Sequence, residues 1–139
     1  MKLLCFQAKR FRWKSYAKTV AEVSDQDVEE EVEQVVVIFV HAEKSDEDLS
    51  RKDSILRQTL KHIKWLANKR SLKNIVLHSF THLGGFNASS SFAELFIDTI
   101  AQRLCDTGYR VYTTPFGYFC EWDLNVYGES LAKVWKEIH

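Results

Sequence analysis

The chain has 139 residues, of which 45% are hydrophobic and 27% are charged, and its formal net charge is zero. This length suits a single domain, residues 1–139, that buries a core of its own, and the composition is ordinary for a globular protein. A zero net charge excludes a global positive field, so any nucleic-acid contact must come from a local patch of charge. No apolar run approaches the about 20 residues of a membrane span, and the stretch before Lys9 is too short for a signal peptide.

The three cysteines point to a reducing compartment. Cys5, Cys105 and Cys120 form no C-x-x-C pair, and their odd number argues against a disulfide framework. Disulfides are rare where thiols are kept reduced. We therefore expect a cytoplasmic protein without a membrane partner.

The first part of the chain consists mainly of predicted strands. Residues 3–8 form a short apolar strand, and the alternation of residues 11–14 predicts another, with a hairpin turn at Lys9-Arg10. The acidic stretch 22–33 is typical of a solvated loop. The β-branched run 35–40 predicts a central strand that is buried on both faces.

Two predicted helices alternate with strands in the middle of the chain. Apolar residues recur at helical spacing within residues 50–70, and residues 75–77 form another buried strand. Ser91 and Glu94 match an S-x-x-E capping box, which predicts a second helix that Gly108 ends.

The C-terminal part predicts two more strands and a short helix. The strands are residues 109–114 and the alternating residues 119–127, and residues 131–138 carry the apolar spacing of a helix. This order of elements predicts an α/β (α+β) fold, in which helices pack on a single mixed β-sheet.

Two segments begin as strands and then break into polar or glycine-containing backbone. They are residues 78–85, HSFTHLGG, and residues 113–120, TTPFGYFC, which contain the only proline. At such breaks a fold can present N–H and C=O groups to a ligand. These segments are the strongest candidates for a functional site.

His78 and His82 lie four residues apart, a spacing that raises the question of a zinc site. The spacing falls on a strand that runs into a loop rather than on a helix, and no third or fourth ligand lies nearby in sequence, so we expect no metal site. His78 is predicted to be a strand residue with a satisfied ring. His82, beside Gly84-Gly85, is either a functional group or an organiser of the loop.

Cys120 shares the apolar face of its predicted strand with Trp122 and Leu124. A buried thiol is usually inert, because a low dielectric raises its pKa. An inert Cys120 is therefore favoured over a nucleophilic one.

A basic cluster near the N-terminus is interleaved with aromatic residues; it consists of Lys9, Arg10, Arg12 and Lys14. This mixture suits a phosphate backbone and an unstacked base. An edge hairpin whose charges prevent sheet-to-sheet pairing fits the sequence equally well. A second basic cluster, within residues 61–73, has the pattern of an ordinary solvated helix face.

The motifs FTHL, residues 80–83, and PFGY, residues 115–118, flank a long predicted helix. In this order and separation they resemble the editing domain of archaeal threonyl-tRNA synthetases, whose relatives include the D-aminoacyl-tRNA deacylases. The segment VVIFVHAEK, residues 36–44, adds to the likeness. The resemblance implies a D-aminoacyl-tRNA deacylase-like fold and no cofactor. It also implies three partners: the tRNA 3′ end that carries serine, the rest of a threonyl-tRNA synthetase, and a second copy in a homodimer.

The implied activity is hydrolysis of L-serine that has been attached by mistake to threonine tRNA. Serine lacks only one methyl group of threonine, and one methyl group in a pocket discriminates by only about 1–3 kcal/mol. A second site that admits serine and excludes the extra methyl group removes the errors that remain.

The resemblance also implies roles for individual residues. Backbone near Ala42, Thr81 and the segment Phe116-Gly117-Tyr118 would hold the seryl group, and His82 would orient it. The ribose hydroxyl of the tRNA would assist the attacking water, and backbone donors would stabilise the developing oxyanion. The basic cluster Lys9, Arg10, Arg12 and Lys14 would contact the tRNA.

The chain departs from the family pattern at three positions. After PFGY the family carries a tyrosine and then a lysine, where this chain has Phe119 and Cys120, and Lys133 replaces a glutamate. We expect Lys133, on the predicted final helix, to face the same cavity as Cys120 and to supply the missing positive charge. Two other functions stay open: a non-catalytic module that binds aminoacyl-tRNA ends, and a D-aminoacyl-tRNA deacylase.

Overall fold

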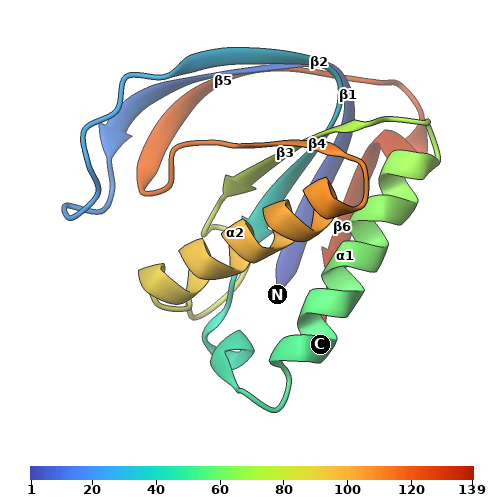
Figure 1. Ribbon diagram of the computed structural model, residues 1–139. Coiled ribbons are helices and arrows are strands. Elements are labelled where there is room, and N and C mark those ends of the chain that lie inside the picture. Colours follow the sequence, from blue (N-terminus) through green and yellow to red (C-terminus); the bar gives the residue numbers. More distant parts are fainter.

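One six-stranded sheet organises the chain, and two long helices pack on one of its faces (Figure 1). The structure is a computed structural model that describes residues 1–139. The elements are β1 (Lys2–Lys18), β2 (Glu29–His41), η1 (Lys44–Glu47), α1 (Lys52–Asn68), β3 (Asn74–Ser79), α2 (Ser90–Asp106), β4 (Arg110–Thr113), β5 (Tyr118–Val126), η2 (Ser130–Ala132) and β6 (Lys133–Glu137). The predicted fold class, a single mixed sheet with helices packed on it, is confirmed.

The strand order places three parallel strands side by side. The sheet runs β4-β3-β2-β1-β5, and β6 also pairs with β1. β2, β3 and β4 are mutually parallel, whereas β1 is antiparallel to its neighbours β2, β5 and β6. The carboxyl ends of parallel strands meet at the same edge of a sheet, so the segments that follow β2, β3 and β4 all start at one edge.

β1 is a single long strand, and the predicted hairpin turn at Lys9-Arg10 is wrong. The chain continues through this point with a shift of register between Ala8 and Arg10 in its pairing with β5. Such an irregularity bends a strand without ending it. The predicted acidic loop also ends early, because β2 starts at Glu29 and pairs with β1 from there.

The predicted C-terminal helix is also wrong. Residues 133–137 form β6, which pairs with the first five residues of β1. β5 pairs with β1 only from Ala8 onward, so this edge of β1 would otherwise expose unpaired N–H and C=O groups. Long-range strand pairing therefore outweighs the local apolar spacing in determining the structure of this segment.

The helices begin and end close to the predicted positions. α1 spans residues 52–68, and Gly108, with φ of +97°, follows the end of α2. The N-cap of α2 is Ser89, whose side chain accepts a hydrogen bond from the Phe92 N–H, so the predicted capping box at Ser91 is wrong.

Side chains are buried on both faces of the sheet. Val36, Ile38 and Val40 of β2 belong to the core beneath the helices. Val37 and Phe39 point to the opposite face, where the bent strands enclose a second core that contains Trp13. The prediction that residues 35–40 are buried on both faces is confirmed. No helix in the structure has the length and apolar character needed to cross a membrane.

Candidate functional site

The two segments that the sequence singles out lie next to each other at the carboxyl edge of the parallel strands. The Phe80 N–H donates to the Val40 carbonyl at 3.0 Å, and the Thr114 N–H donates to the Leu77 carbonyl at 3.1 Å. The rings and side chains also connect the strands, since His78 Nδ1 lies 2.7 Å from Thr114 Oγ1. The structure thus brings the ends of β2, β3 and β4 together, although the three segments are far apart in the chain.

A buried histidine holds the loop that carries His82. The Leu83 N–H donates to His41 Nδ1 at 3.2 Å, and His41 Nε2 lies 2.8 Å from Asn87 Oδ1. A backbone N–H can only donate, so Nδ1 is the acceptor, and the proton of the neutral ring is on Nε2, which donates to Asn87. His41 is fully buried. The sequence analysis missed it, because nothing in the residue pattern separates it from the rest of a buried strand.

Backbone hydrogen bonds hold the same loop against the end of β2. The Ala88 N–H donates to the Ala42 carbonyl at 3.0 Å, and the Lys44 N–H donates to the Phe86 carbonyl at 2.9 Å. The Ala42 carbonyl, which lies where main-chain groups are predicted to bind the substrate, therefore already accepts a hydrogen bond from within the protein. Loop 80–88 is ordered by β2 rather than by its own short-range contacts.

His82 lies at the exposed end of a cluster of aromatic rings. Its ring stands edge-on to Phe80, with centroids 5.0 Å apart, and Phe80 contacts Phe39 and Trp122 in turn. His82 makes no hydrogen bond within the protein and is exposed, as is Thr81. Both ring nitrogens of His82 are therefore available to a ligand.

His78 is a structural residue. Its ring is buried, contacts Phe39 and Trp122 edge-on, and uses Nδ1 for Thr114. Burial lowers the pKa of His78 to about 4, so the ring is neutral at pH 7. The prediction of a satisfied strand histidine is confirmed. No group of three or more His, Cys, Asp or Glu side chains is arranged to hold a metal ion.

The segment after β4 holds the loop between β1 and β2. Gly117 has φ of +77°, and its carbonyl accepts hydrogen bonds from the N–H groups of Thr19 and Val20. The Tyr118 hydroxyl accepts from the Gln26 N–H at 2.8 Å and donates to the Ser24 carbonyl at 3.1 Å. Tyr118 is thus tied to loop 19–28, and its hydroxyl is already used.

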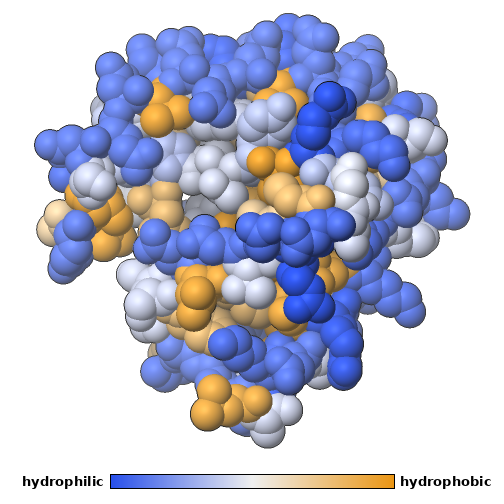
Figure 2. Space-filling model, viewed as in Figure 1, coloured by the Kyte–Doolittle hydropathy of each residue, from blue (hydrophilic) through white to orange (hydrophobic).

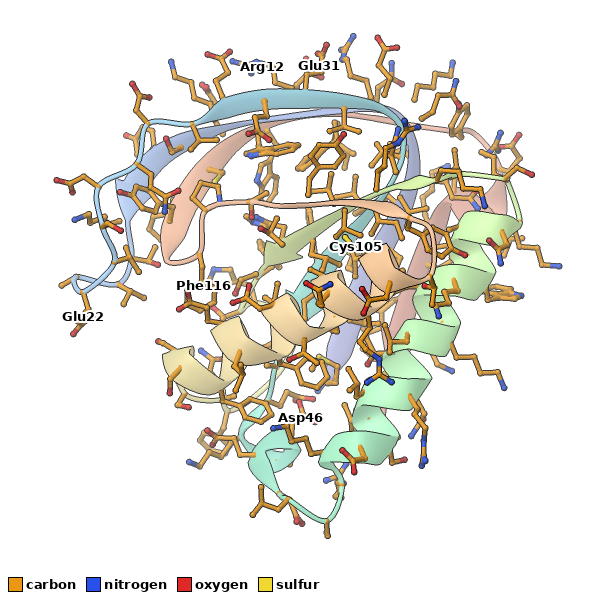
Figure 3. The ribbon with its side chains drawn as sticks, viewed as in Figure 1. Arg12, Glu22, Glu31, Asp46, Cys105 and Phe116 are labelled. Carbon is orange, nitrogen blue, oxygen red and sulfur yellow. The ribbon has the colours of Figure 1, made fainter.

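A cleft of about 820 Å³ opens beside Phe116, between loop 19–28, the ends of β3 and β4, and the first turns of α2. Figure 2 shows this hollow above α2, and Figure 3 shows Phe116 between the β4–β5 connection and α2. Four carboxylates and no Lys or Arg line the cleft; they are Glu22, Glu30, Glu94 and Asp98. Such a lining favours an ammonium group over a phosphate.

The cleft does not include the rest of the predicted site. Ala42, Thr81, His82 and Gly117 are absent from its lining. The side chains of Leu77 and Ser79 that line it point to the helix face, whereas alternation puts His78 and Phe80 on the other face. Phe116 therefore borders the cleft, while His82 lies with the aromatic rings beyond the strand ends.

The structure separates Lys133 from Cys120. Cys120 pairs with Ser15 of β1, and Lys133 pairs with Phe6, nine residues away, which is about 30 Å along an extended strand. The Lys133 ammonium group donates to the Gly128 carbonyl at 3.3 Å. The expectation that Lys133 lies on a helix and faces the same cavity as Cys120 is wrong, because this segment is the strand β6.

Cys120 is half-buried against the second core, together with Leu124. This confirms the expected apolar face of β5. Burial raises the pKa of the Cys120 thiol, so the thiolate is disfavoured.

The basic cluster lies on the outer face of the sheet, where acidic side chains surround it. Arg10 forms ion pairs with Glu31 at 3.4 Å and with Asp123 at 3.2 Å, and Arg12 pairs with Glu29 at 2.8 Å. Figure 3 shows Arg12 and Glu31 projecting from this face. Lys14 has Glu29 and Glu121 as its cross-strand neighbours, and Lys9 lies over the Tyr127 ring. A tRNA phosphate would have to displace carboxylates here, so a role of this cluster in tRNA binding stays a prediction.

Residues 1–138 match the profile of a family described as the archaea-specific editing domain of threonyl-tRNA synthetase. The chain belongs to this family. It is 28% identical over 142 residues to a threonine–tRNA ligase of Staphylothermus marinus, covering 99% of this chain and 22% of the relative. It is 27% identical over 129 residues to that of Methanosphaera stadtmanae, covering 93% of this chain and 21% of the relative. The chain thus spans about a fifth of the length of these curated relatives.

A solved structure confirms the fold of this editing-domain chain. The c-Myc DNA unwinding element binding protein superposes with a TM-score of 0.68 and 14% sequence identity, over 100% of this chain and 99% of that one. At this identity the likeness concerns the fold alone. Because the chain is an editing domain of the synthetase family, the implied chemistry is aminoacyl-tRNA hydrolysis in general.

Proposed function

We propose that this chain is a single editing domain that hydrolyses L-seryl-tRNA formed by mistake on threonine tRNA. The observation that carries the proposal is the meeting of the FTHL and PFGY segments at one edge, where parallel strands end, in a chain of the editing family. The ligand would lie over the ends of β2, β3 and β4. Main-chain groups near Ala42, Thr81 and Phe116-Gly117 would hold the seryl group.

In this proposal His82 orients the ester. Its ring is exposed, free of partners and carried by a loop that His41 fixes in place. A positioned group of this kind contributes about 10²–10⁴-fold to a rate. The ribose hydroxyl of the tRNA would assist the attacking water, as the family resemblance implies.

The acidic lining of the cleft beside Phe116 supports one direction of approach for the substrate. An aminoacyl ester carries an ammonium group, which the four carboxylates of the cleft favour, while the nucleotide phosphates are repelled. The amino acid would therefore approach from the strand ends, with the phosphates outside the cleft. The preference for serine over threonine would come from the lack of room for one methyl group.

A second function is favoured by one observation. Cys120, with a raised pKa, occupies the position of the family lysine, so a module that binds the aminoacyl-tRNA end without hydrolysing it fits the same site. Partners in either case would be the tRNA 3′ end, the rest of a threonyl-tRNA synthetase and a second copy of the chain.

The test is deacylation of L-seryl-, L-threonyl- and D-aminoacyl-tRNA by the purified chain, with His82→Ala as the matched variant. Editing predicts hydrolysis of L-seryl-tRNA well above the other two, with a loss of at least about 10²-fold in the variant. Preferential hydrolysis of D-aminoacyl-tRNA would assign the chain to the deacylases. Binding of the 3′ end without hydrolysis of any ester would establish the binding module.

A further inference from the structure

Two clusters of cations on this chain differ in the number of carboxylates beside them. On the outer face of the sheet the arginines are paired with carboxylates, as described above. On α1, Lys52, Arg57, Lys61 and Lys64 accompany a single carboxylate, Asp53 in the first turn. The zero net charge of the chain therefore hides a local excess of positive charge along this helix.

We define the α1 face as six cations on α1, on the turn after it and on the adjacent edge of β6: Arg57, Lys61, Lys64, Lys69, Lys73 and Lys136. No carboxylate forms an ion pair with any of them. Arg57, Lys61 and Lys64 follow one another at spacings of four and three, so they lie on one side of the helix. Lys136 lies close enough to His62 of α1 to lower the pKa of that ring, after the larger effect of burial.

Aromatic rings lie beside two of these cations. Lys69 Nζ lies 5.9 Å from the centroid of the Trp65 ring, and Lys73 Nζ lies 5.4 Å from that of Tyr109. Trp65 is 42% exposed on the solvent side of α1 and stacks loosely against His62, with centroids 5.7 Å apart. Lysines interleaved with an exposed indole are the combination that binds a phosphate backbone and tolerates any base sequence.

The arrangement has a cost that a bound polyanion would offset. Like charges three and four residues apart destabilise a helix, whereas alternating signs would support it. On the outer face of the sheet the same chain pairs Arg10 and Arg12 with carboxylates, so the scarcity of acids along α1 is local. We infer that the α1 face binds the phosphate backbone of tRNA, outside the site that takes the aminoacyl end.

This inference rests on the proposed function for the choice of tRNA as the polyanion. α1 starts one short connection after the carboxyl end of β2 and runs away from the strand ends, alongside β6 (Figure 1). Its 17 residues span about 25 Å. A tRNA whose 3′ end reaches the strand ends is large enough to contact this face as well. The carboxylates of the cleft repel phosphates, so the phosphate backbone must be bound at another surface.

The test measures binding of an unacylated tRNA transcript by the full chain between 50 and 200 mM KCl. One variant combines Lys61→Gln, Lys64→Gln and Lys69→Gln. Its matched control combines Lys18→Gln, Arg103→Gln and Arg110→Gln, which removes the same charge from exposed positions outside the α1 face and outside the basic cluster of β1. We expect the α1 variant to bind at least about tenfold more weakly and to lose about 2–3 from the slope of log K against log salt, with the control close to wild type.

Three results would overturn the inference: wild-type chain that binds no tRNA at 50 mM KCl, an α1 variant that binds like wild type, or equal losses in both variants. A different result is a wild-type chain that binds no tRNA and instead associates with itself in a salt-sensitive way that the α1 variant abolishes and the control variant keeps. This result would assign the α1 face to the carboxylates on the outer sheet face of a second copy. Unacylated tRNA carries no ester, so this outcome is independent of hydrolysis. Failure of the proposed function would appear separately, as absent deacylation by a chain that still binds tRNA through α1.

Discussion

The hydrogen bonds of His41 predict a variant that loosens the candidate site without unfolding the protein. His41→Phe keeps an aromatic ring of similar size in a fully buried position and removes both ring nitrogens. The Leu83 N–H then lacks its acceptor, at about 1–3 kcal/mol for an unsatisfied buried donor, and the bond to Asn87 is lost at about 0.5–1.5 kcal/mol. We expect the free energy of unfolding to fall by about 1.5–4.5 kcal/mol, which a typical domain survives.

The rate should fall more than stability explains. His82 lies one residue before Leu83, so loss of the Leu83 hydrogen bond displaces the group that orients the ester, and a 1 Å displacement can cost about 10²-fold. The assay pairs urea unfolding with seryl-tRNA hydrolysis at a temperature where every variant is folded. His41→Gln offers the rescue, because its amide oxygen can accept from Leu83 and its amide nitrogen can donate to Asn87.

The matched control is Ile63→Ala, which removes a fully buried side chain of α1 at about 2–5 kcal/mol and touches no part of the loop. If His41→Phe and Ile63→Ala lose similar stability and both keep the wild-type rate, His41 is a structural residue only. A His41→Gln variant as slow as His41→Phe would also contradict the reasoning.

Four further predictions follow from single features of the structure. Gly117→Ala should lower the free energy of unfolding by at least about 1–2 kcal/mol, because φ is +77° and the new Cβ would lie 2.9 Å from a Val23 methyl carbon. The control is Gly85→Ala, whose Cβ would have no atom within 4 Å and which should match wild type in urea unfolding. The pKa of His78 is about 4 in the folded protein and about 6.5 in the unfolded chain, so the stabilisation that depends on a neutral His78 ring is complete above pH 6.5 and is lost as the pH falls toward 4, by up to about 3 kcal/mol. The free energy of unfolding should therefore fall less steeply with falling pH for His78→Asn than for wild type. Superimposable curves for the two proteins would exclude His78 as a source of the pH dependence. Lys133→Ala should leave seryl-tRNA hydrolysis unchanged, because β6 holds Lys133 far from Cys120 along β1, and a strong loss of rate would restore the charge-replacement hypothesis. Hydrolysis should survive a chelator, and zinc retained in stoichiometric amount would contradict this.

The elements that the sequence predicts well are those whose signals are local. The apolar spacing within residues 50–70 indicates a helix and the β-branched run 35–40 indicates a strand, and the structure has α1 and β2 at these positions. The site edge could also be predicted in outline, because polar breaks after parallel strands meet at one edge. In the structure the segments 78–85 and 113–120 lie side by side, as the contact between His78 and Thr114 shows.

The errors occur where a distant segment decides the structure. β6 forms because the first half of β1 has a free edge, and no pattern within residues 131–138 contains that information. The hairpin at Lys9-Arg10 is absent because β2 and β5 pair with both sides of a continuous β1. His41 could not be found either, since its role depends on two hydrogen bonds to a loop more than 40 residues later.

Residues 119, 120 and 133, where the resemblance implies a departure from the family pattern, lie outside the hydrogen-bonded framework of the candidate site. The contacts that assemble the strand ends come from His41, His78, Thr114 and main-chain groups, and none of them involves residue 119, 120 or 133. We therefore expect this framework to hold an aminoacyl end without the positive charge that the family resemblance implies for residue 120. Cys120 is a residue of β5 that is half-buried against the second core. A lysine introduced at this position would have to extend its ammonium group past Leu124 to reach water or a ligand. The rate of a Cys120→Lys variant thus measures the contribution of that charge on an otherwise unchanged site.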